Sequence, residues 1–199
     1  MMFITKSEGQ LISELSTMGF SYDGIDDIYK QKSLPHDVVR AILRSFKNVY
    51  QEHLGSGDHL LRSLISADEP FDPTIIIDFF EENTYNMSVM WGVAYVLAMA
   101  KTYDIGEWLK NQLLKEPPTF ERQGLVYGLI EKGGFKDSAE LKSFLEKIFP
   151  KYPFAVIELY KKVGSKEDAL FLEGQRNNYN SDVNKEIDKL IVRLGKKKR

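Results

Sequence analysis

The chain has 199 residues, of which 43% are hydrophobic and 28% charged, a composition typical of a folded single domain. It contains no cysteine, which excludes disulfides, a thiolate nucleophile and cysteine metal ligands. No apolar run approaches the roughly 18 residues that a membrane span needs, and the first residues do not resemble a signal peptide. We therefore expect no membrane association and a cytoplasmic location.

The spacing of apolar residues predicts helices in the first part of the chain. They are expected at 7–18, 24–31, 35–50, 58–66 and 73–80. Gly19 predicts the end of the first helix, and Gly55–Gly57 predicts the break between the third and the fourth. Ile75–Ile77 is β-branched and would also suit a strand, but Pro73 is typical of a helical first turn and favours a helix there.

The second part of the chain adds a weak internal repeat to the helical pattern. Helices are expected at 87–102, 105–115, 119–132, 137–149, 152–163, 166–174 and 182–197. Residues 89–118 and 121–150, compared at a shift of 32 positions, share eight identical residues, where average composition gives about two. Leucines continue this interval at positions 97, 129, 159 and 190. A fixed period of this size is typical of repeat proteins.

This repeat predicts the fold class. One helical hairpin cannot bury its apolar stripe alone, whereas stacked hairpins bury a continuous core made by the recurring leucines. We therefore expect an all-α protein with a single repeat domain over residues 1–199, clearest over 73–195. Gly134, Gly164 and Gly195 are expected to end helices with a positive φ.

Two segments carry a resemblance to a known family. Residues 121–130 (ERQGLVYGLI) and 91–97 (WGVAYVL) resemble the second helix of HEAT-like repeats, and Arg122 stands where those repeats often place an arginine. The other repeats lack this arginine, and Asn177–Asn180 interrupts the last pair. The resemblance implies a right-handed α-solenoid of about five to six hairpins, whose second helices line a concave side that meets a partner. Those helices would be 24–31, 57–66, 87–102, 119–132, 152–163 and 182–197.

The charge distribution points to a partner surface. Residues 1–116 carry a net charge of −7 and residues 117–199 a net charge of +5, and neither lysine nor arginine occurs between Arg62 and Lys101. Six carboxylates fill this interval: Asp68, Glu69, Asp72, Asp78, Glu81 and Glu82. Four aromatic residues lie on predicted second helices: Trp91, Tyr95, Tyr127 and Tyr160. We take these ten residues as candidates for partner binding. The alternative is a solvated acidic face with tyrosines that pack between repeats.

No pattern of residues predicts catalysis. His36, His53 and His59 do not have the helical spacing of metal ligands, and adjacent carboxylates such as Asp26 and Asp27 do not face each other on a helix. Gly55–Gly57 is too short to cradle a phosphate. The basic residues 196–199, which follow Gly195, match the favourable placement of cations at a helix C-terminus. We expect no enzyme, no cofactor and no metal.

These observations favour a non-enzymatic scaffold that binds a protein partner. Small, cysteine-free helical proteins with an acidic face are similar to immunity proteins, which neutralise bacterial toxins. In that version, the acidic stretch would mimic nucleic acid in front of a basic nuclease toxin. Two alternatives stay open: a HEAT-like DNA glycosylase or other nucleic-acid-binding protein, and an adaptor subunit of a larger complex. We do not expect nucleic acid as the partner, because residues 63–100 are wholly non-basic.

Overall fold

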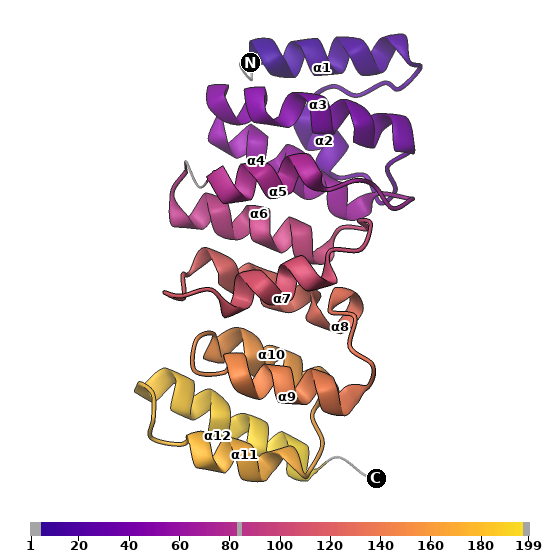
Figure 1. Cartoon of the computed structure of the whole chain (residues 1–199). Coiled ribbons are helices and arrows are strands. Elements are labelled where there is room, and N and C mark those ends of the chain that lie inside the picture. The colour runs from indigo at the N-terminus through magenta and orange to yellow at the C-terminus, as the bar shows by residue number, and fades with distance from the viewer. Residues whose placement is uncertain (1–4, 83–84, 197–199) are drawn as a thin grey trace. The chain divides into compact units, whose positions relative to one another are not determined.

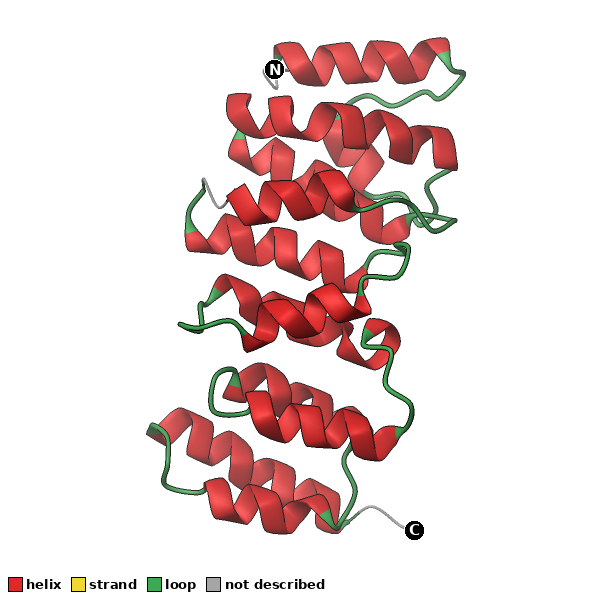
Figure 2. Cartoon of the chain, in the orientation of Figure 1, coloured by secondary structure: helices red, strands yellow, loops and turns green. Residues whose placement is uncertain are grey.

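The computed structural model describes residues 5–82 and 85–196, and within these ranges the chain consists of helices and loops without a strand (Figures 1 and 2). The predicted all-α class is therefore confirmed, including a helix at Ile75–Ile77. The end of the basic tail, residues 197–199, lies outside the described residues. None of the described helices combines the length and apolar character that crossing a membrane requires.

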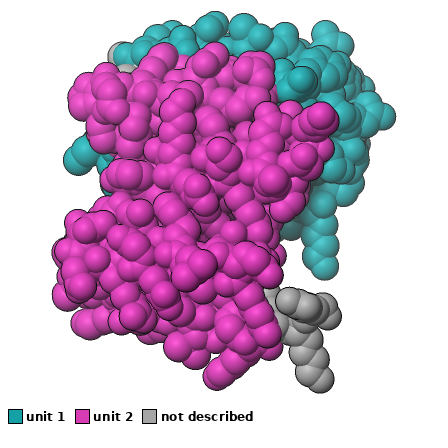
Figure 3. Space-filling model, turned by 60° about the horizontal axis from the view of Figure 1, so that its bottom comes forward, with its two compact units in different colours: residues 1–105, 120–128 teal, residues 106–119, 129–199 magenta. Residues whose placement is uncertain are grey.

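The chain divides into two compact units, coloured separately in Figure 3. Unit 1 comprises residues 1–105 and 120–128, and unit 2 comprises residues 106–119 and 129–199. By sequence, unit 1 has 16 acidic and 9 basic side chains, whereas unit 2 has 13 acidic and 18 basic ones. The charge asymmetry of the sequence thus follows the units. The single domain predicted over 1–199 stays a prediction, because the structure defines each unit by itself.

Unit 1 consists of helices arranged in two rows (Figure 1). The first row contains α1 (Lys6–Thr17), α3 (His36–Glu52) and α5 (Thr74–Glu82). The second row contains α2 (Ile25–Tyr29), α4 (Leu54–Ser63), α6 (Met87–Met99) and the 3-10 helix η2 (Glu121–Gly128). Neighbours within each row pack in chain order, and α3 packs on α4 as α5 does on α6. A short 3-10 turn, η1 (Leu64–Ser66), extends α4.

The two rows enclose the core of unit 1. Helix α3 supplies Val38, Ile42 and Phe46, which recur at the helical period and are fully buried. Helix α6 is apolar nearly all round, since it packs on α4, α5 and η2. Helices of this kind are typical of a buried position. The burial of Leu97 on α6 agrees with its place in the predicted leucine ladder.

Backbone hydrogen bonds tie the loops between successive hairpins of unit 1. Leu34 donates to and accepts from the loop 66–68, with N–O distances of 2.8 and 3.0 Å. Phe71 does the same with the loop 101–103, at 3.2 and 2.9 Å. These isolated bridges satisfy backbone groups that would otherwise need water.

Unit 2 contains six α-helices within its described residues. They are α7 (Gly106–Leu114), α8 (Leu129–Lys132), α9 (Ser138–Ile148), α10 (Pro153–Val163), α11 (Asp168–Gln175) and α12 (Ser181–Gly195). Helix α10 packs on α9 and α12, and α11 packs on α12. The ladder residues Leu129, Leu159 and Leu190 are all fully buried, as predicted.

An ion pair with little exposure joins α9 to the start of α11. Lys142 Nζ lies 2.8 Å from Asp168 Oδ2, which also accepts a hydrogen bond from the Ser165 backbone N–H. Burial alone would raise the pKa of Asp168, but the hydrogen bonds from Lys142 and Ser165 outweigh it and lower that pKa. Unit 2 thus has a defined polar link between two of its helices.

Four local predictions were wrong. Helices α3 and α4 are separated at His53, which has an extended backbone and caps α4 with its side chain, so Gly55–Gly57 lies inside the first turn of α4. The predicted helix 119–132 is η2 followed by the short α8. Gly134 has the predicted positive φ of 62°, but Gly164 has a φ of −68°. Gly195 has no positive φ either, because α12 includes it and ends at the C-cap Lys196. Gly164 is instead close to its neighbours, since a Cβ there would lie 2.5 Å from the Tyr160 carbonyl oxygen.

Candidate functional site

Three aromatic side chains form a cluster on the second row of unit 1. Trp91 and Tyr95 are one turn apart on α6 and stack with ring centroids 5.3 Å apart and planes 10° apart. Tyr127 on η2 packs edge-on against Trp91 and Tyr95, at 6.4 and 5.7 Å. All three side chains are half-buried. The structure therefore brings together three of the four aromatic candidates and leaves part of each available at the surface.

Glycine holds η2 unusually close to α6. A Cβ at Gly124 would lie 2.8 Å from the Trp91 carbonyl oxygen and 2.9 Å from the Ala94 Cβ. In a 3-10 helix, side chains three residues apart eclipse, so Gly124 and Tyr127 lie on the same side of η2. Gly124 thus meets the backbone of α6, and Tyr127 lies beside the two rings of that helix. This close backbone approach fixes the spacing of the three rings.

An ion pair lies next to this cluster, on α4. Arg62 Nε lies 2.7 Å from Asp58 Oδ2, one helical turn away. A Cβ at Gly92 would lie 2.8 Å from Asp58 Oδ1, so the pair packs against α6 beside Trp91. The charge of Arg62 is thereby balanced within unit 1.

Two of the candidate carboxylates have local structural roles. Asp72 accepts hydrogen bonds from the backbone N–H and the hydroxyl of Thr74, at 2.9 and 2.5 Å, at the start of α5. These bonds lower the pKa of Asp72. Asp68 accepts a hydrogen bond of 2.6 Å from the Ser33 hydroxyl, which joins the first and second inter-hairpin loops. Glu69 lies beside Asp68 and is exposed.

The other candidate carboxylates lie on α5. This helix buries Ile76, Phe79 and Phe80 against its neighbours. Asp78, Glu81 and Glu82 are exposed, and Glu82 lies 3.0 Å from Lys47 Nζ on α3. One face of α5 packs on α6, and these three exposed carboxylates lie outside that packed face. The ring contacts of the aromatic cluster join α6 and η2 instead.

Tyr160 does not contribute to an exposed surface. It belongs to α10 in unit 2, is fully buried and packs at a ring-centroid distance of 6.1 Å from Phe171. Its hydroxyl has no hydrogen-bond partner, and burial raises its pKa. The alternative reading of a tyrosine packed inside the protein fits Tyr160, and we omit it from the docking surface.

A cavity in unit 1 brings together residues that the sequence analysis judged separately. It has a volume of about 650 Å³, within the usual range of ligand pockets, and lies among α1, α2 and the start of α4. The charged and imidazole side chains that line it are Glu8, Asp23, Asp26, Asp27, Lys30, His53 and His59. Sequence reasoning identified neither the cavity nor Glu8, because these residues come from three separate helices and their connecting loops.

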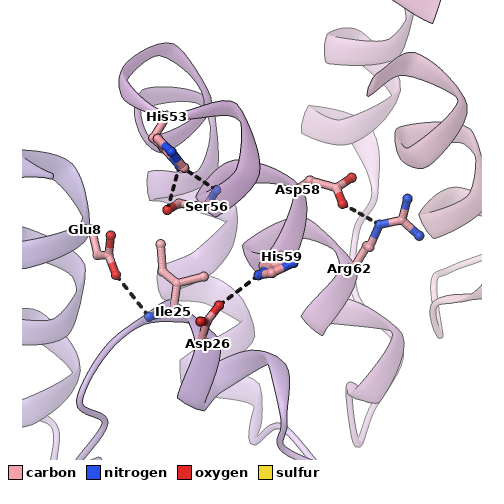
Figure 4. Close-up of polar contacts among 8 residues, drawn as sticks. All are labelled: Glu8, Ile25, Asp26, His53, Ser56, Asp58, His59 and Arg62. Carbon is pink, nitrogen blue, oxygen red and sulfur yellow. Dashed lines mark hydrogen bonds and ion pairs between the residues drawn. The ribbon is translucent and has the colours of Figure 1, made fainter. Parts of the chain in front are cut away.

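The polar contacts of this cavity connect adjacent helices (Figure 4). Glu8 Oε1 on α1 accepts a hydrogen bond of 3.2 Å from the Ile25 backbone N–H, which caps α2 in place of the missing side chain of Gly24. His59 Nδ1 on α4 lies 2.8 Å from Asp26 Oδ1 on α2. The ring of Tyr29 stacks on His59, with centroids 4.8 Å apart and planes 7° apart.

His53 also lines the cavity. The Ser56 backbone N–H donates to His53 Nδ1 over 3.0 Å, so the imidazole caps the first turn of α4 (Figure 4). Among the described residues, no group of three or more histidine, cysteine or acidic side chains has the geometry to hold a metal ion.

The second row places equivalent residues at a constant interval. Asp26, His59 and Gly92 are separated by 33 residues each, and they lie on α2, α4 and α6. Tyr29, Arg62, Tyr95 and Tyr127 follow the same register, with intervals of 33, 33 and 32. Residues at this interval thus take part in both the cavity and the aromatic cluster. This register is a signal that a search for repeats in the first hundred residues could have found.

Comparisons with protein-family models, with curated proteins and with solved structures found no match to this chain.

Proposed function

We propose that this chain is a non-enzymatic scaffold that binds a protein partner through the second row of unit 1. The observation that carries the proposal is the partly exposed cluster of Trp91, Tyr95 and Tyr127, which packs beside the close approach at Gly124. Tryptophan and tyrosine dominate the binding energy of protein interfaces, and rings that are already fixed lose little entropy on binding.

The charge of unit 1 supports a partner with a basic surface. Its net charge is −7, and Arg62, which packs against Gly92 on α6, is already paired with Asp58. Such a field accelerates encounter with a basic protein and repels nucleic acid. The most concrete version of the proposal is an immunity protein that neutralises a cognate toxin, with a basic nuclease domain as the partner.

We also propose the finer fold that suits this function, a right-handed α-solenoid of HEAT-like hairpins. The constant register of Tyr29, Arg62, Tyr95 and Tyr127 on the second row supports it, as does the even spacing of the buried leucines. In such a fold, each hairpin adds one line of side chains to the docking face.

The test compares capture from the native host by three forms of the full chain. The W91A/Y95A variant removes the stacked pair, and Tyr103→Ala removes an aromatic ring of unit 1 that is 58% exposed but lies outside the cluster. The proposal expects a protein that the wild type and Tyr103→Ala retain and W91A/Y95A loses, with unchanged helicity in all three. If W91A/Y95A retains every protein that the wild type captures, the proposed docking face is contradicted.

The immunity version has its own test. The captured protein, expressed alone in a bacterium, is expected to arrest growth, and coexpression of this chain is expected to restore it. A harmless partner would contradict the immunity version and leave the scaffold in place.

The acidic face of α5 is a second part of the proposal. Neutralising Asp78, Glu81 and Glu82 together is expected to slow association with the captured partner and to weaken its dependence on salt. An association rate equal to that of the wild type at low salt would assign binding to the aromatic face alone.

A further inference from the structure

We infer that the cavity among α1, α2 and α4 receives the guanidinium group of an arginine side chain on the partner protein. Four carboxylates line this cavity against a single lysine: Glu8, Asp23, Asp26 and Asp27 oppose Lys30. An arginine side chain would offset this excess of negative charge. The inference rests on the proposed function, because it requires a protein partner on the same face.

The carboxylates retain capacity to accept hydrogen bonds from a ligand. Glu8 uses Oε1 to accept from Ile25, and Asp26 uses Oδ1 to bind His59. Asp27 uses Oδ2 to accept from the Asp23 backbone N–H over 3.3 Å. Each of these bonds engages one oxygen, whereas a carboxylate offers two oxygens with about four lone-pair sites. A guanidinium carries five N–H donors in a planar fork that suits such acceptors.

The ring of His59, which lines the cavity, favours guanidinium over a simple ammonium. Tyr29 stacks in parallel on His59 without lining the cavity itself, and 43% of Tyr29 is exposed. Arginine is planar, weakly hydrated and stacks on aromatic rings, whereas the lysine ammonium is compact and strongly hydrated. The Asp26–His59 hydrogen bond holds the imidazole in place, so the stacking surface exists before the ligand arrives.

The position of the cavity connects it to the aromatic cluster. His59 and Arg62 are one turn apart on α4, and the Arg62–Asp58 pair packs on α6 at Gly92, next to Trp91. All of these residues belong to unit 1. A partner that covers Trp91 and Tyr95 would therefore extend along the row to the cavity.

The test needs no partner, because it uses free Nα-acetyl-L-arginine amide as the probe. Titration of the full chain, followed by amide chemical shifts, is expected to perturb Gly24, Ser56 and His59 in a saturable way. Nα-acetyl-L-citrulline amide has nearly the same shape without the charge and is expected to bind at least about fivefold more weakly, the effect of one favourable ion pair. Equal shifts with both probes would overturn the inference.

Two variants locate the binding site. Asp26→Asn removes the carboxylate that binds His59, and Asp23→Asn removes an exposed carboxylate outside helix α2, which keeps the test valid if Asp26→Asn disturbs that helix. Each is expected to reduce the affinity for the arginine probe about fivefold. Asp78→Asn on α5 is the matched control and is expected to change nothing. An equal loss in all three variants would show non-specific attraction to a negative protein and would contradict a defined site.

The two proposals fail in different ways. The W91A/Y95A variant is expected to lose the partner but keep the arginine probe, because those rings do not line the cavity. If the wild type binds the partner but not the arginine probe, the arginine site is contradicted and the scaffold proposal is not. If the probe binds and no protein depends on Trp91 and Tyr95, the scaffold proposal falls.

Discussion

His59 on α4 lies 2.8 Å from Asp26 on α2, across 33 residues of sequence. The same interval leads from His59 to Gly92 on α6, where the absent side chain leaves room for the Asp58–Arg62 pair. Positions 26, 59 and 92 thus hold a carboxylate, an imidazole and a glycine in successive helices of the second row. Asp26 pairs with His59 on the next helix, and Gly92 admits the ion pair of the preceding one.

Replacing Gly124 by valine is expected to destabilise unit 1. The new Cβ would lie 2.8 Å from the Trp91 carbonyl oxygen and 2.9 Å from the Ala94 Cβ, so η2 must move away from α6. Overpacking of this kind costs roughly 1–3 kcal/mol of unfolding free energy, measured by urea denaturation. Gly174→Ala on α11 is the control, because its Cβ meets nothing within 4 Å, and a gain of roughly 0.5–1 kcal/mol is expected there.

Leu129→Ala is expected to lower the free energy of unfolding by roughly 2–5 kcal/mol, since this leucine is fully buried in unit 2. Chemical denaturation measures the change. Leu170→Ala on α11 serves as a comparison, because 78% of that side chain is exposed and the substitution removes little packing. If both substitutions lowered the free energy of unfolding by a similarly small amount, the assignment of Leu129 to the core would be contradicted.

Tyr50→Phe is expected to leave stability unchanged or to raise it. The Tyr50 ring packs on Phe46 and Phe79, but its buried hydroxyl has no hydrogen-bond partner, and burial raises its pKa. Removing an unsatisfied hydroxyl keeps the ring contacts and relieves a desolvation cost. Urea denaturation at neutral pH measures the difference, and a clear loss of stability would mean that the hydroxyl makes a bond in solution.

Lys132 is expected to make stability depend on pH. Burial lowers the pKa of this lysine to about 8, well below the ordinary value of 10.5. The folded state therefore loses this proton before the unfolded state does, and stability rises as the pH increases from about 8 toward 10. Lys132→Met is expected to be more stable than the wild type at pH 7, with a smaller advantage at pH 9.5. A constant difference in thermal midpoint over this range would contradict the burial of the ammonium.

The helices could be predicted because each carries its own apolar stripe. Val38, Ile42 and Phe46 mark the buried side of α3 without reference to any other segment. The winding of η2 could not be predicted in this way, because it accompanies a contact between Gly124 and the backbone of α6, and local sequence does not reveal that distance. The break at His53 escaped prediction for a similar reason, since a histidine that caps α4 leaves the following glycines inside the helix.

The residues of the aromatic cluster could be singled out from the sequence, whereas the cavity could not. Trp91, Tyr95 and Tyr127 are conspicuous residues at repeat-equivalent or helical spacings. Asp26 and His59 are each ordinary surface residues, and their pairing shows only when α2 and α4 are placed side by side. Tyr160 was wrongly expected at the surface, because its sequence position and residue type alone do not distinguish a packed ring from an exposed one.

The reciprocal backbone bonds of Leu34 and Phe71 give unit 1 a natural probe of cooperativity. Each of these amides is held by a carbonyl from the following connection, so it becomes accessible to deuterium only when two successive hairpins separate. Slow hydrogen exchange at both positions, with the same free energy of opening, would mean that the hairpins of unit 1 unfold together rather than one after another.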